Sequence, residues 1–275
     1  MQKPKLIAID IDGTLSTGDP FAIPEPVLQR LNTSKHHIVL ASGRTINEIK
    51  TLGFSGGMIG GNGGTVIRDG QTLFDSHIEL DVATKLIDWI KENNYIFQVH
   101  SESEVIVEKD ADILGELALI ANMVEGNDAR IERFNFVFNH VYNKNVKVTD
   151  VIDYIHAENH VIKKIEIFKG PDKSKDIEYI NNNFNLSAFS SVPTNIEIVP
   201  KDVNKGTALR KYNFDDKYEL YTIGDGDNDL PMFAVAKASF AVDNGSDLVK
   251  EAATYIVPSV ADFGVLQALD IIDTL

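Results

Sequence analysis

The chain has 275 residues, enough for one large or two ordinary domains, and its 43% hydrophobic and 24% charged residues are typical of soluble globular proteins. Its 41 acidic against 26 basic residues give a net charge of −15, which argues against nucleic acid or an anionic membrane as a partner. The absence of cysteine excludes disulfides and thiolate chemistry, and without a signal-peptide pattern or an apolar run of ~20 residues we expect a cytoplasmic protein.

Strand and helix patterns alternate over the first eighty residues. Continuous apolar runs at 5–10 (KLIAID) and 36–41 (HHIVLA) predict buried strands. Apolar residues at helical spacing in 23–34 and 45–53 predict helices after each of them. Residues 56–67 (GGMIGGNGGTVI) have the pattern of two strands joined by an Asn-Gly turn. Such alternation is typical of an α/β fold with a doubly wound parallel sheet.

The pattern changes in the middle of the chain. Long amphipathic helices such as 81–94 are mixed there with pairs of strands, which suits an α+β module. The first pattern returns with the apolar strand at 195–200 and continues to the C-terminus. We therefore expect a discontinuous core domain at 1–80 and 190–275, interrupted by an inserted α+β domain at 81–189.

Four clusters of polar residues and glycines follow predicted strands or open a predicted helix. They are Asp10-Ile11-Asp12-Gly13-Thr14, Ser42-Gly43-Arg44, Asn204-Lys205-Gly206 and Gly224-Asp225-Gly226-Asp227-Asn228-Asp229. Because ligands bind at the carboxyl edge of an open parallel sheet, we expect these clusters to meet in one site.

The residue types in these clusters point to phosphoryl chemistry. Several carboxylates together suit a hard cation such as Mg²⁺, whereas lysine, serine and backbone amides at a helix N-terminus bind phosphoryl oxygens. A carboxylate that reaches phosphorus can act as a nucleophile and form an aspartyl-phosphate. A second carboxyl group can protonate the leaving alkoxide and then deprotonate the attacking water.

The order DxDGT, strand-end serine, lysine and GDxxND resembles the motif set of the haloacid dehalogenase-like (HAD) superfamily of phosphotransferases. With an insert between the second and third motifs, the chain is similar over essentially its whole length to the Cof-type group with a type IIB cap. NGGTVI, GDGDNDLPMF and AVDNGSDLVKEAATYIV look like that group's versions. The chain departs from the usual pattern at STGDP after Leu15 and at AVDNGSD, which replaces a Gly-Asn-Ala stretch. The resemblance implies a Rossmann-like core and a cap that contacts the leaving group.

The resemblance also implies roles for the residues of the first three motifs. Asp10 would be the nucleophile and a metal ligand. Asp12 would be the general acid/base, with its backbone carbonyl on the metal. Ser42 and Lys205 would bind the phosphoryl oxygens, and Lys205 would also restrain Asp10.

In the fourth motif, the resemblance implies that Asp225 binds Mg²⁺ directly, that Asp229 acts mostly through a metal-bound water, and that Asn228 lies close to the phosphate or the metal. Gly43 and Arg44 are further candidates for phosphate or substrate binding. For Arg44, binding of a second anionic group of the substrate and pairing with a surface carboxylate are equal alternatives.

Each cluster also has a purely structural interpretation. Asp10 and Asp12 could form an Asx turn, Ser42 could cap the helix that follows it, and Lys205 could be a solvated surface residue. Asn62 is better explained by the hairpin turn. The stretch GDGDND resembles a calcium loop, but it lacks the closing glutamate and follows a strand. The combination of four clusters favours the functional interpretation.

We therefore predict a Mg²⁺-dependent phosphatase that hydrolyses a small phosphorylated metabolite, a sugar or polyol phosphate, through an aspartyl-phosphate at Asp10. One alternative is a phosphomutase of the same superfamily, which would return the phosphate to the sugar. Another is a protein that binds a phosphorylated ligand as a sensor with little turnover. Neither nucleic acid nor a membrane is expected as a partner, and the sequence leaves the substrate and the oligomeric state open.

Overall fold

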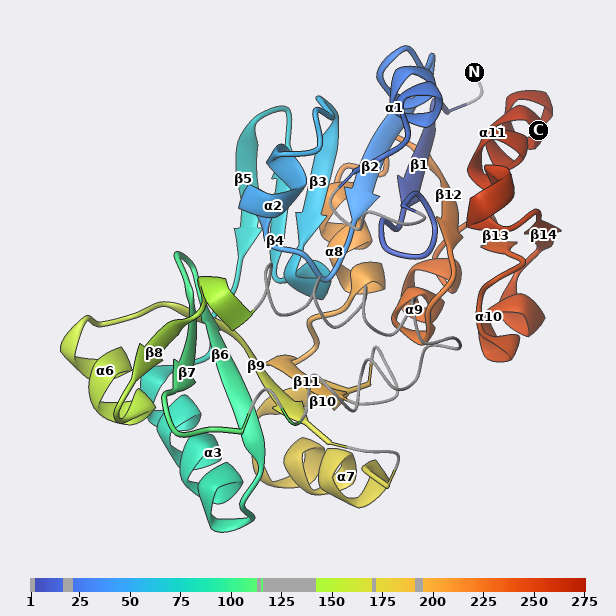
Figure 1. Ribbon diagram of the computed structural model, residues 1–275. Coiled ribbons are helices and arrows are strands. Elements are labelled where there is room, and N and C mark those ends of the chain that lie inside the picture. The colour runs from blue at the N-terminus through green and yellow to red at the C-terminus, as the bar shows by residue number, and fades with distance from the viewer. Residues whose placement is uncertain (1–2, 17–21, 113–114, 116–141, 170–171, 191–194) are drawn as a thin grey trace. The chain divides into compact units, whose positions relative to one another are not determined.

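The computed structural model describes residues 3–16, 22–112, 115, 142–169, 172–190 and 195–275 (Figure 1). The chain divides into two compact units, of which the first combines Met1–Ser76 with Asp202–Leu275 and the second is His77–Lys201. The first unit is therefore discontinuous in sequence. Within the described part of the chain, no helix combines the length and the apolar character needed to cross a membrane.

An eight-stranded sheet forms the centre of the first unit. Its strands are β1 (Lys5–Ile9), β2 (His37–Ala41), β3 (Gly57–Gly60), β4 (Thr65–Arg68), β5 (Gln71–Asp75), β12 (Glu219–Gly224), β13 (Ala238–Val242) and β14 (Tyr255–Val257). They lie in the order β14-β13-β12-β1-β2-β3-β4-β5 and run parallel from β14 to β3, whereas β4 and β5 pair antiparallel. The parallel part confirms the α/β class, and the pairing of β3 with β4 confirms the expected hairpin.

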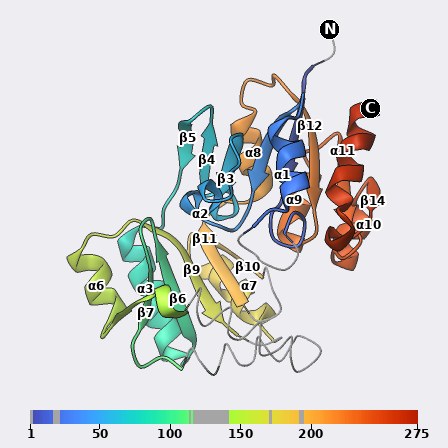
Figure 2. The ribbon, with the colours of Figure 1, turned by 45° about the horizontal axis from the view of Figure 1, so that its top comes forward.

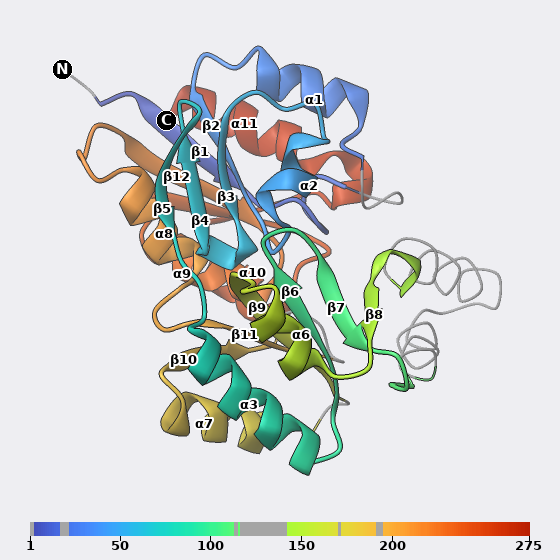
Figure 3. The ribbon, with the colours of Figure 1, turned by 90° about the vertical axis from the view of Figure 1, so that its left-hand side faces the viewer.

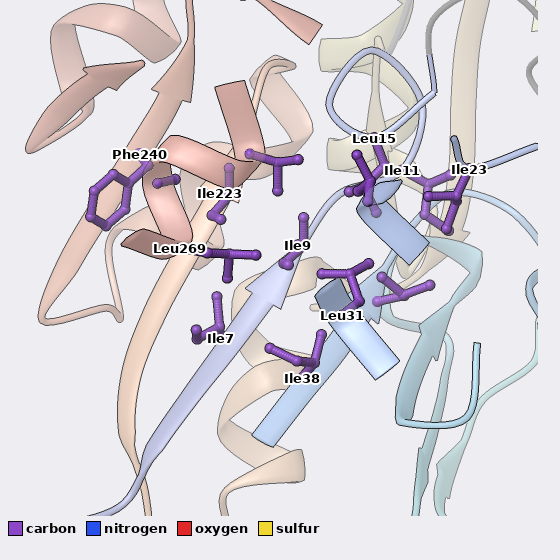
Figure 4. Packing of buried hydrophobic residues seen from close by; sticks show 14 of the residues in the cluster. Ile7, Ile9, Ile11, Leu15, Ile23, Leu31, Ile38, Ile223, Phe240 and Leu269 are labelled. Carbon is purple, nitrogen blue, oxygen red and sulfur yellow. The ribbon is translucent and has the colours of Figure 1, made fainter. Parts of the chain in front are cut away.

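Two hydrophobic cores lie on the two faces of this sheet. Successive residues of β1 point to opposite faces, so Ile7 and Ile9 belong to one core and Leu6 and Ala8 to the other. Figure 4 shows the first core, with Leu269 beside the two isoleucines. The helices of the unit are α1 (Glu25–Asn32), α2 (Ile46–Lys50), α8 (Lys205–Tyr212), α9 (Leu230–Phe233), α10 (Asp247–Ala252) and α11 (Gly264–Thr274), with the 3-10 turns η1 (Gly61–Gly63), η3 (Asp227–Asp229) and η4 (Val260–Asp262).

The second unit is built on a six-stranded sheet in the order β10-β11-β9-β6-β7-β8 (Figure 2, Figure 3). Its strands are β6 (Ile96–Ser101), β7 (Val105–Glu108), β8 (Val146–Val148), β9 (Ile162–Phe168), β10 (Leu186–Phe189) and β11 (Asn195–Pro200). Its described helices are α3 (Leu80–Glu92), α6 (Val151–Ala157) and α7 (Ser174–Asn183), with the 3-10 turn η2 (Tyr142–Lys144). Ile87 of α3, Ile155 of α6 and Ile180 of α7 share a core with Ile165 and Ile167 of β9. The helices therefore cover one face of this sheet.

The inserted unit ends later in the sequence than expected. Residues 195–200 are expected in the core domain from their apolar pattern, but they form β11, which pairs antiparallel with β9 and β10 in the second sheet. The units consequently divide after Ser76 and after Lys201, rather than at 80 and 189. The physical reason is that NIEIVP can form a strand in either sheet, and only its pairing partners decide which one it joins.

Candidate active site

Asp10 lies directly after β1, at the carboxyl edge of the parallel sheet. Its N–H donates to the carbonyl oxygen of Ile223 at 3.0 Å, so the ladder to β12 continues through it. The chain then turns at Gly13, which has a φ of +90°. A Cβ on Gly13 would lie 2.2 Å from Oδ2 of Asp225. Only glycine therefore allows this turn to approach the Asp225 carboxylate so closely.

Ser42 lies directly after β2 at the same edge and is buried. Its N–H donates to the carbonyl oxygen of Ile59 at 2.9 Å, and its hydroxyl accepts the N–H of Arg44 at 3.2 Å. Helix α2 is instead capped by Thr45, whose hydroxyl accepts the N–H of Glu48 while the Glu48 carboxylate accepts the N–H of Thr45. The interpretation of Ser42 as a helix cap is therefore wrong.

Lys205 is the first residue of α8 and its side chain has no exposed surface. Asn204 caps the helix by accepting the N–H of Thr207 at 2.8 Å. Nζ of Lys205 donates to Oδ1 of Asp10 at 2.5 Å and to Oδ1 of Asp229 at 2.6 Å. One buried ammonium group thus joins the first and fourth sequence clusters.

The turn after β12 places two further carboxylates beside this lysine. Oδ2 of Asp229 accepts the N–H groups of Asp225 at 2.9 Å and Gly226 at 3.0 Å, while its Oδ1 is bound to Lys205. Oδ1 of Asp225 accepts the hydroxyl of Thr14 at 2.7 Å. Both oxygens of the fully buried Asp229 are therefore engaged by the protein itself.

Asp10, Asp225 and Asp229 form a group that fits a metal ion. Each offers one carboxylate oxygen, and these three oxygens lie within 4.8 Å of one another. Oxygen ligands at this spacing suit a hard divalent cation. Lys205 supplies one positive charge against these three carboxylates, so a divalent cation would balance the remaining charge.

The pKa values of the cluster reflect its burial. Burial raises the pKa of Asp10 well above its usual value; Lys205 lowers it, and Asp229 and Asp225 raise it further. Burial also raises the pKa of Asp225 to about 6, against the hydrogen bond from Thr14. Burial lowers the pKa of Lys205, but the charges of Asp10 and Asp229 outweigh burial, so that this pKa rises overall. Keeping the carboxyl groups of Asp10 and Asp225 ionised therefore opposes folding until a cation binds.

Asp12 has a different partner from Asp10. Nε of Arg44 donates to Oδ2 of Asp12 at 2.9 Å, and Nη2 donates to Oδ1 at 2.5 Å. Of the two alternatives for Arg44, the structure shows pairing with a carboxylate, and that carboxylate belongs to the candidate acid/base. The Asp12 side chain is 48% exposed, in contrast to the buried Asp10.

Asn228 and Asn62 connect the fourth cluster to the second. Nδ2 of Asn228 donates to Oδ1 of Asn62 at 3.0 Å. Asn62 is buried and has a φ of 53°, a left-handed conformation that asparagine tolerates. A Cβ on Gly43 would lie 3.2 Å from Nδ2 of Asn62. Asn62 therefore contacts a residue of the site, in addition to forming the hairpin turn to which the sequence assigns it.

Two residues without an expected role also support the site. Thr14 is fully buried and its hydroxyl donates to Asp225. Its position in the DxDGT motif is the sequence feature that points to it. Nδ2 of Asn244, in the AVDNGSD stretch, donates to the carbonyl oxygen of Gly13 at 2.8 Å, and its Oδ1 accepts the N–H of Val260. No sequence signal identifies Asn244. Residues 17–20 of the other unusual stretch lie outside the described residues.

A family model described as haloacid dehalogenase-like hydrolase matches residues 7–269, a span that contains all of these site residues. The chain belongs to this family. Phosphotransferases of the HAD superfamily use a metal ion, and the aspartate cluster of this chain provides a place for one.

Relatives of the chain are named as phosphatases. It is 27% identical over 279 residues to 5-amino-6-(5-phospho-D-ribitylamino)uracil phosphatase YwtE of Bacillus subtilis, with 97% of each chain covered. A haloacid dehalogenase-like hydrolase structure from B. subtilis has a TM-score of 0.81 at 20% identity, covering 97% of this chain and 99% of that one. The HAD subclass IIB sugar phosphatase BT4131 has a TM-score of 0.73 at 19% identity, covering 98% and 100%. These structures establish the fold, and the family and its named members identify a phosphatase.

Proposed function

We propose that this phosphatase hydrolyses the phosphate monoester of a small polyol or sugar, with Mg²⁺ as its metal and Asp10 as its nucleophile. The observation that carries the proposal is the buried cluster in which Lys205 binds Asp10 at 2.5 Å and Asp229 at 2.6 Å, with Asp225 as a third carboxylate. Bound Mg²⁺ would offset negative charge on the phosphoryl oxygens.

Asp10 is the carboxylate best placed to attack phosphorus. It extends a strand that is paired on both sides, with β2 and with β12, so its position is rigid. It is only 5% exposed, and Lys205 holds its Oδ1. A fixed, water-excluded carboxylate is suited to form a bond to phosphorus as the bond to the ester oxygen breaks.

The other motif residues have distinct parts in this proposal. Asp12 gives a proton to the leaving ester oxygen and then takes one from the water that attacks the aspartyl-phosphate. The products are the alcohol, inorganic phosphate and free Asp10. Ser42 and Asn228 bind phosphoryl oxygens. Asp229, with both oxygens engaged by the protein, holds Lys205 and would act on the metal through a water, the role that the resemblance implies.

The second unit is proposed to be the cap that sets substrate specificity. On the face of its sheet opposite to the helices, the Glu166 carboxylate accepts hydrogen bonds from Gln98 and Asn195, each at 2.7 Å. Nζ of Lys164 lies 3.3 Å from a carboxylate oxygen of Glu197. Burying charged groups destabilises the folded state, and such groups often mark functional sites. We therefore propose these residues as the first candidates for recognition of the substrate.

The relative YwtE suggests which substrate to try first. Its name describes a phosphatase for 5-amino-6-(5-phospho-D-ribitylamino)uracil. The phosphate of that compound is carried by a ribityl chain, so it is a polyol phosphate, the class expected from the sequence. We propose this compound as the leading candidate substrate for the present chain.

The proposal is tested by phosphate release from a panel of phosphorylated metabolites, including this compound, ribitol phosphate and sugar phosphates, with Mg²⁺ and with EDTA. The wild type is expected to hydrolyse a polyol phosphate only when metal is present. Asp10→Asn should lower turnover by about 10³-fold or more and keep the circular dichroism spectrum. Asp247→Asn, which alters a 95% exposed carboxylate, is the matched control and should retain full activity.

Each failure has a distinct meaning. Near-wild-type turnover by Asp10→Asn would exclude Asp10 as the nucleophile. A requirement for a bisphosphate activator would favour the phosphomutase. If the wild type released no phosphate from any member of the panel with Mg²⁺ present, the proposed activity would be wrong and a sensor role would be favoured.

A further inference from the structure

Arg44 and Asp12 form a bidentate ion pair in the first unit. Nε of Arg44 donates to Oδ2 of Asp12 at 2.9 Å, and Nη2 donates to Oδ1 at 2.5 Å. Two parallel hydrogen bonds of this kind fix the plane of a carboxylate as well as its position. The Arg44 side chain is 8% exposed and the Asp12 side chain 48% exposed. The arginine is therefore the sheltered partner, which holds the more exposed aspartate.

The backbone of Arg44 is itself fixed by the surrounding loop. Its N–H donates to the hydroxyl of Ser42 at 3.2 Å, and its carbonyl oxygen accepts the N–H of Gly61 at 2.8 Å. A Cβ on Gly60 would lie 3.0 Å from the same carbonyl oxygen, so the end of β3 packs tightly against this loop. The guanidinium group is thus presented from a rigid base.

We propose that Arg44 is a positioning residue that acts through Asp12, and not a binding site for a second anionic group of the substrate. This inference rests on the proposed function, in which Asp12 is the acid/base. A half-exposed aspartate can adopt several rotamers, whereas proton transfer requires its carboxyl group to stay within hydrogen-bond reach of the reacting oxygen. Arg44 holds the Asp12 carboxylate in one orientation through its Nε and Nη2, which both donate to Asp12.

A positioning role and an anion-binding role predict different kinetics. If Arg44 acts only through Asp12, its loss lowers kcat and leaves the binding of phosphate unchanged. If Arg44 binds a substrate anion, its loss raises KM and weakens inhibition by inorganic phosphate. A double-mutant cycle with Asp12 separates the two roles, because residues that act as one unit are strongly non-additive.

The experiment compares Arg44→Gln, Asp12→Asn and the double variant with a substrate that the wild type hydrolyses in Mg²⁺. We expect Asp12→Asn to lower kcat by about 10²–10⁴-fold and Arg44→Gln by about 10–100-fold, with KM changed less than about threefold. The double variant should match Asp12→Asn within about threefold. Multiplied losses in the double variant would overturn the proposal.

Two further measurements support the cycle. The inhibition constant of inorganic phosphate should differ by less than about twofold between wild type and Arg44→Gln, and a rise of tenfold or more would show an anion subsite instead. Arg44→Lys keeps the charge but cannot form the planar fork, so its kcat should stay within about threefold of Arg44→Gln. Full recovery of kcat by Arg44→Lys would also overturn the proposal, because charge alone would then suffice.

The control is Arg30→Gln, which removes another arginine–carboxylate contact of the first unit, with Asp273 at 2.9 Å, between α1 and α11. It should keep wild-type kcat and KM, and circular dichroism verifies that each variant is folded. If the wild type and this control hydrolyse no phosphate ester, the proposed function itself fails. If both are active and the cycle is additive, only the role of Arg44 is wrong.

Discussion

Asp225→Asn is expected to stabilise the metal-free protein while it removes a proposed metal ligand. Burial raises the pKa of Asp225 from 3.8 to about 6, so keeping this carboxyl group ionised near neutral pH opposes folding. Asparagine has nearly the same shape, and its Oδ1 can still accept the hydroxyl of Thr14, which lies 2.7 Å from Oδ1 of Asp225. The substitution therefore removes the charge and keeps the contact.

The magnitude follows from the shift in pKa. A rise from 3.8 to about 6 corresponds to about 3 kcal/mol at 1.36 kcal/mol per pKa unit. Asp225 is only partly buried, and solvent screening reduces this value, so we expect a gain of about 1–3 kcal/mol in the free energy of unfolding. For a unit of this size, that gain corresponds to a rise in Tm of roughly 2–12 °C.

The gain also has a defined dependence on pH. A carboxyl group whose pKa is raised by folding opposes folding above the raised value, and no longer does so below the value in the unfolded chain. The advantage of Asp225→Asn should therefore be complete above about pH 6 and fade as the pH falls from about 6 to 3.8. Denaturant unfolding in EDTA at several pH values measures this directly.

Metal should reverse the order of stability. In Mg²⁺ at 1,000 times its Kd, the wild type is expected to gain about 4.1 kcal/mol, whereas Asp225→Asn, which lacks a proposed ligand, should gain much less. Asp247→Asn is the control and should follow the wild type within about 0.5 kcal/mol in both conditions, because its side chain is 95% exposed. A metal-free Asp225→Asn protein less stable than the wild type near neutral pH would refute the reasoning.

Two other substitutions test buried charges in the two units. Lys205→Met leaves the carboxylates of Asp10 and Asp229 without their ammonium group. It should lower the free energy of unfolding in EDTA by about 3–5 kcal/mol. A loss below about 1 kcal/mol in denaturant unfolding would contradict this. Glu166→Gln replaces one of the two carboxylate oxygens that accept from Gln98 and Asn195 by an NH₂ group. It should lower the free energy of unfolding by about 1–3 kcal/mol. An unchanged denaturation midpoint would show that this network adds no stability.

The placement of the main site residues could be predicted from the sequence. Strands that are buried on both faces are largely apolar, so 6–9 and 220–223 are recognisable as parallel strands of a covered sheet. Polar residues that follow such strands must lie at the carboxyl edge of the sheet. Asp10 and Asp225 meet there, although they are far apart in the sequence.

Other features could not be predicted because local patterns were ambiguous. The alternation in 195–200 is compatible with either sheet, and its membership in the second sheet depends on antiparallel pairing with β9 and β10. Ser42 and Thr45 are both plausible helix caps by residue type, and the backbone conformation at Thr45 decides between them. The hairpin turn explains Asn62 sufficiently, so its contact with Asn228 has no separate signal in the sequence.

By itself, the sequence determined the residue types of the site and the strand ends that carry them, because hydrophobic pattern and turn residues act over short distances along the chain. Only the tertiary structure decided which charged groups pair. Lys205 joins Asp10 to Asp229, and Arg44 binds Asp12 instead of standing free for a substrate anion. These pairings depend on side-chain directions set by packing between distant segments. Those directions separate the proposed nucleophile, Asp10, from the proposed acid/base, Asp12, which follows it by two residues.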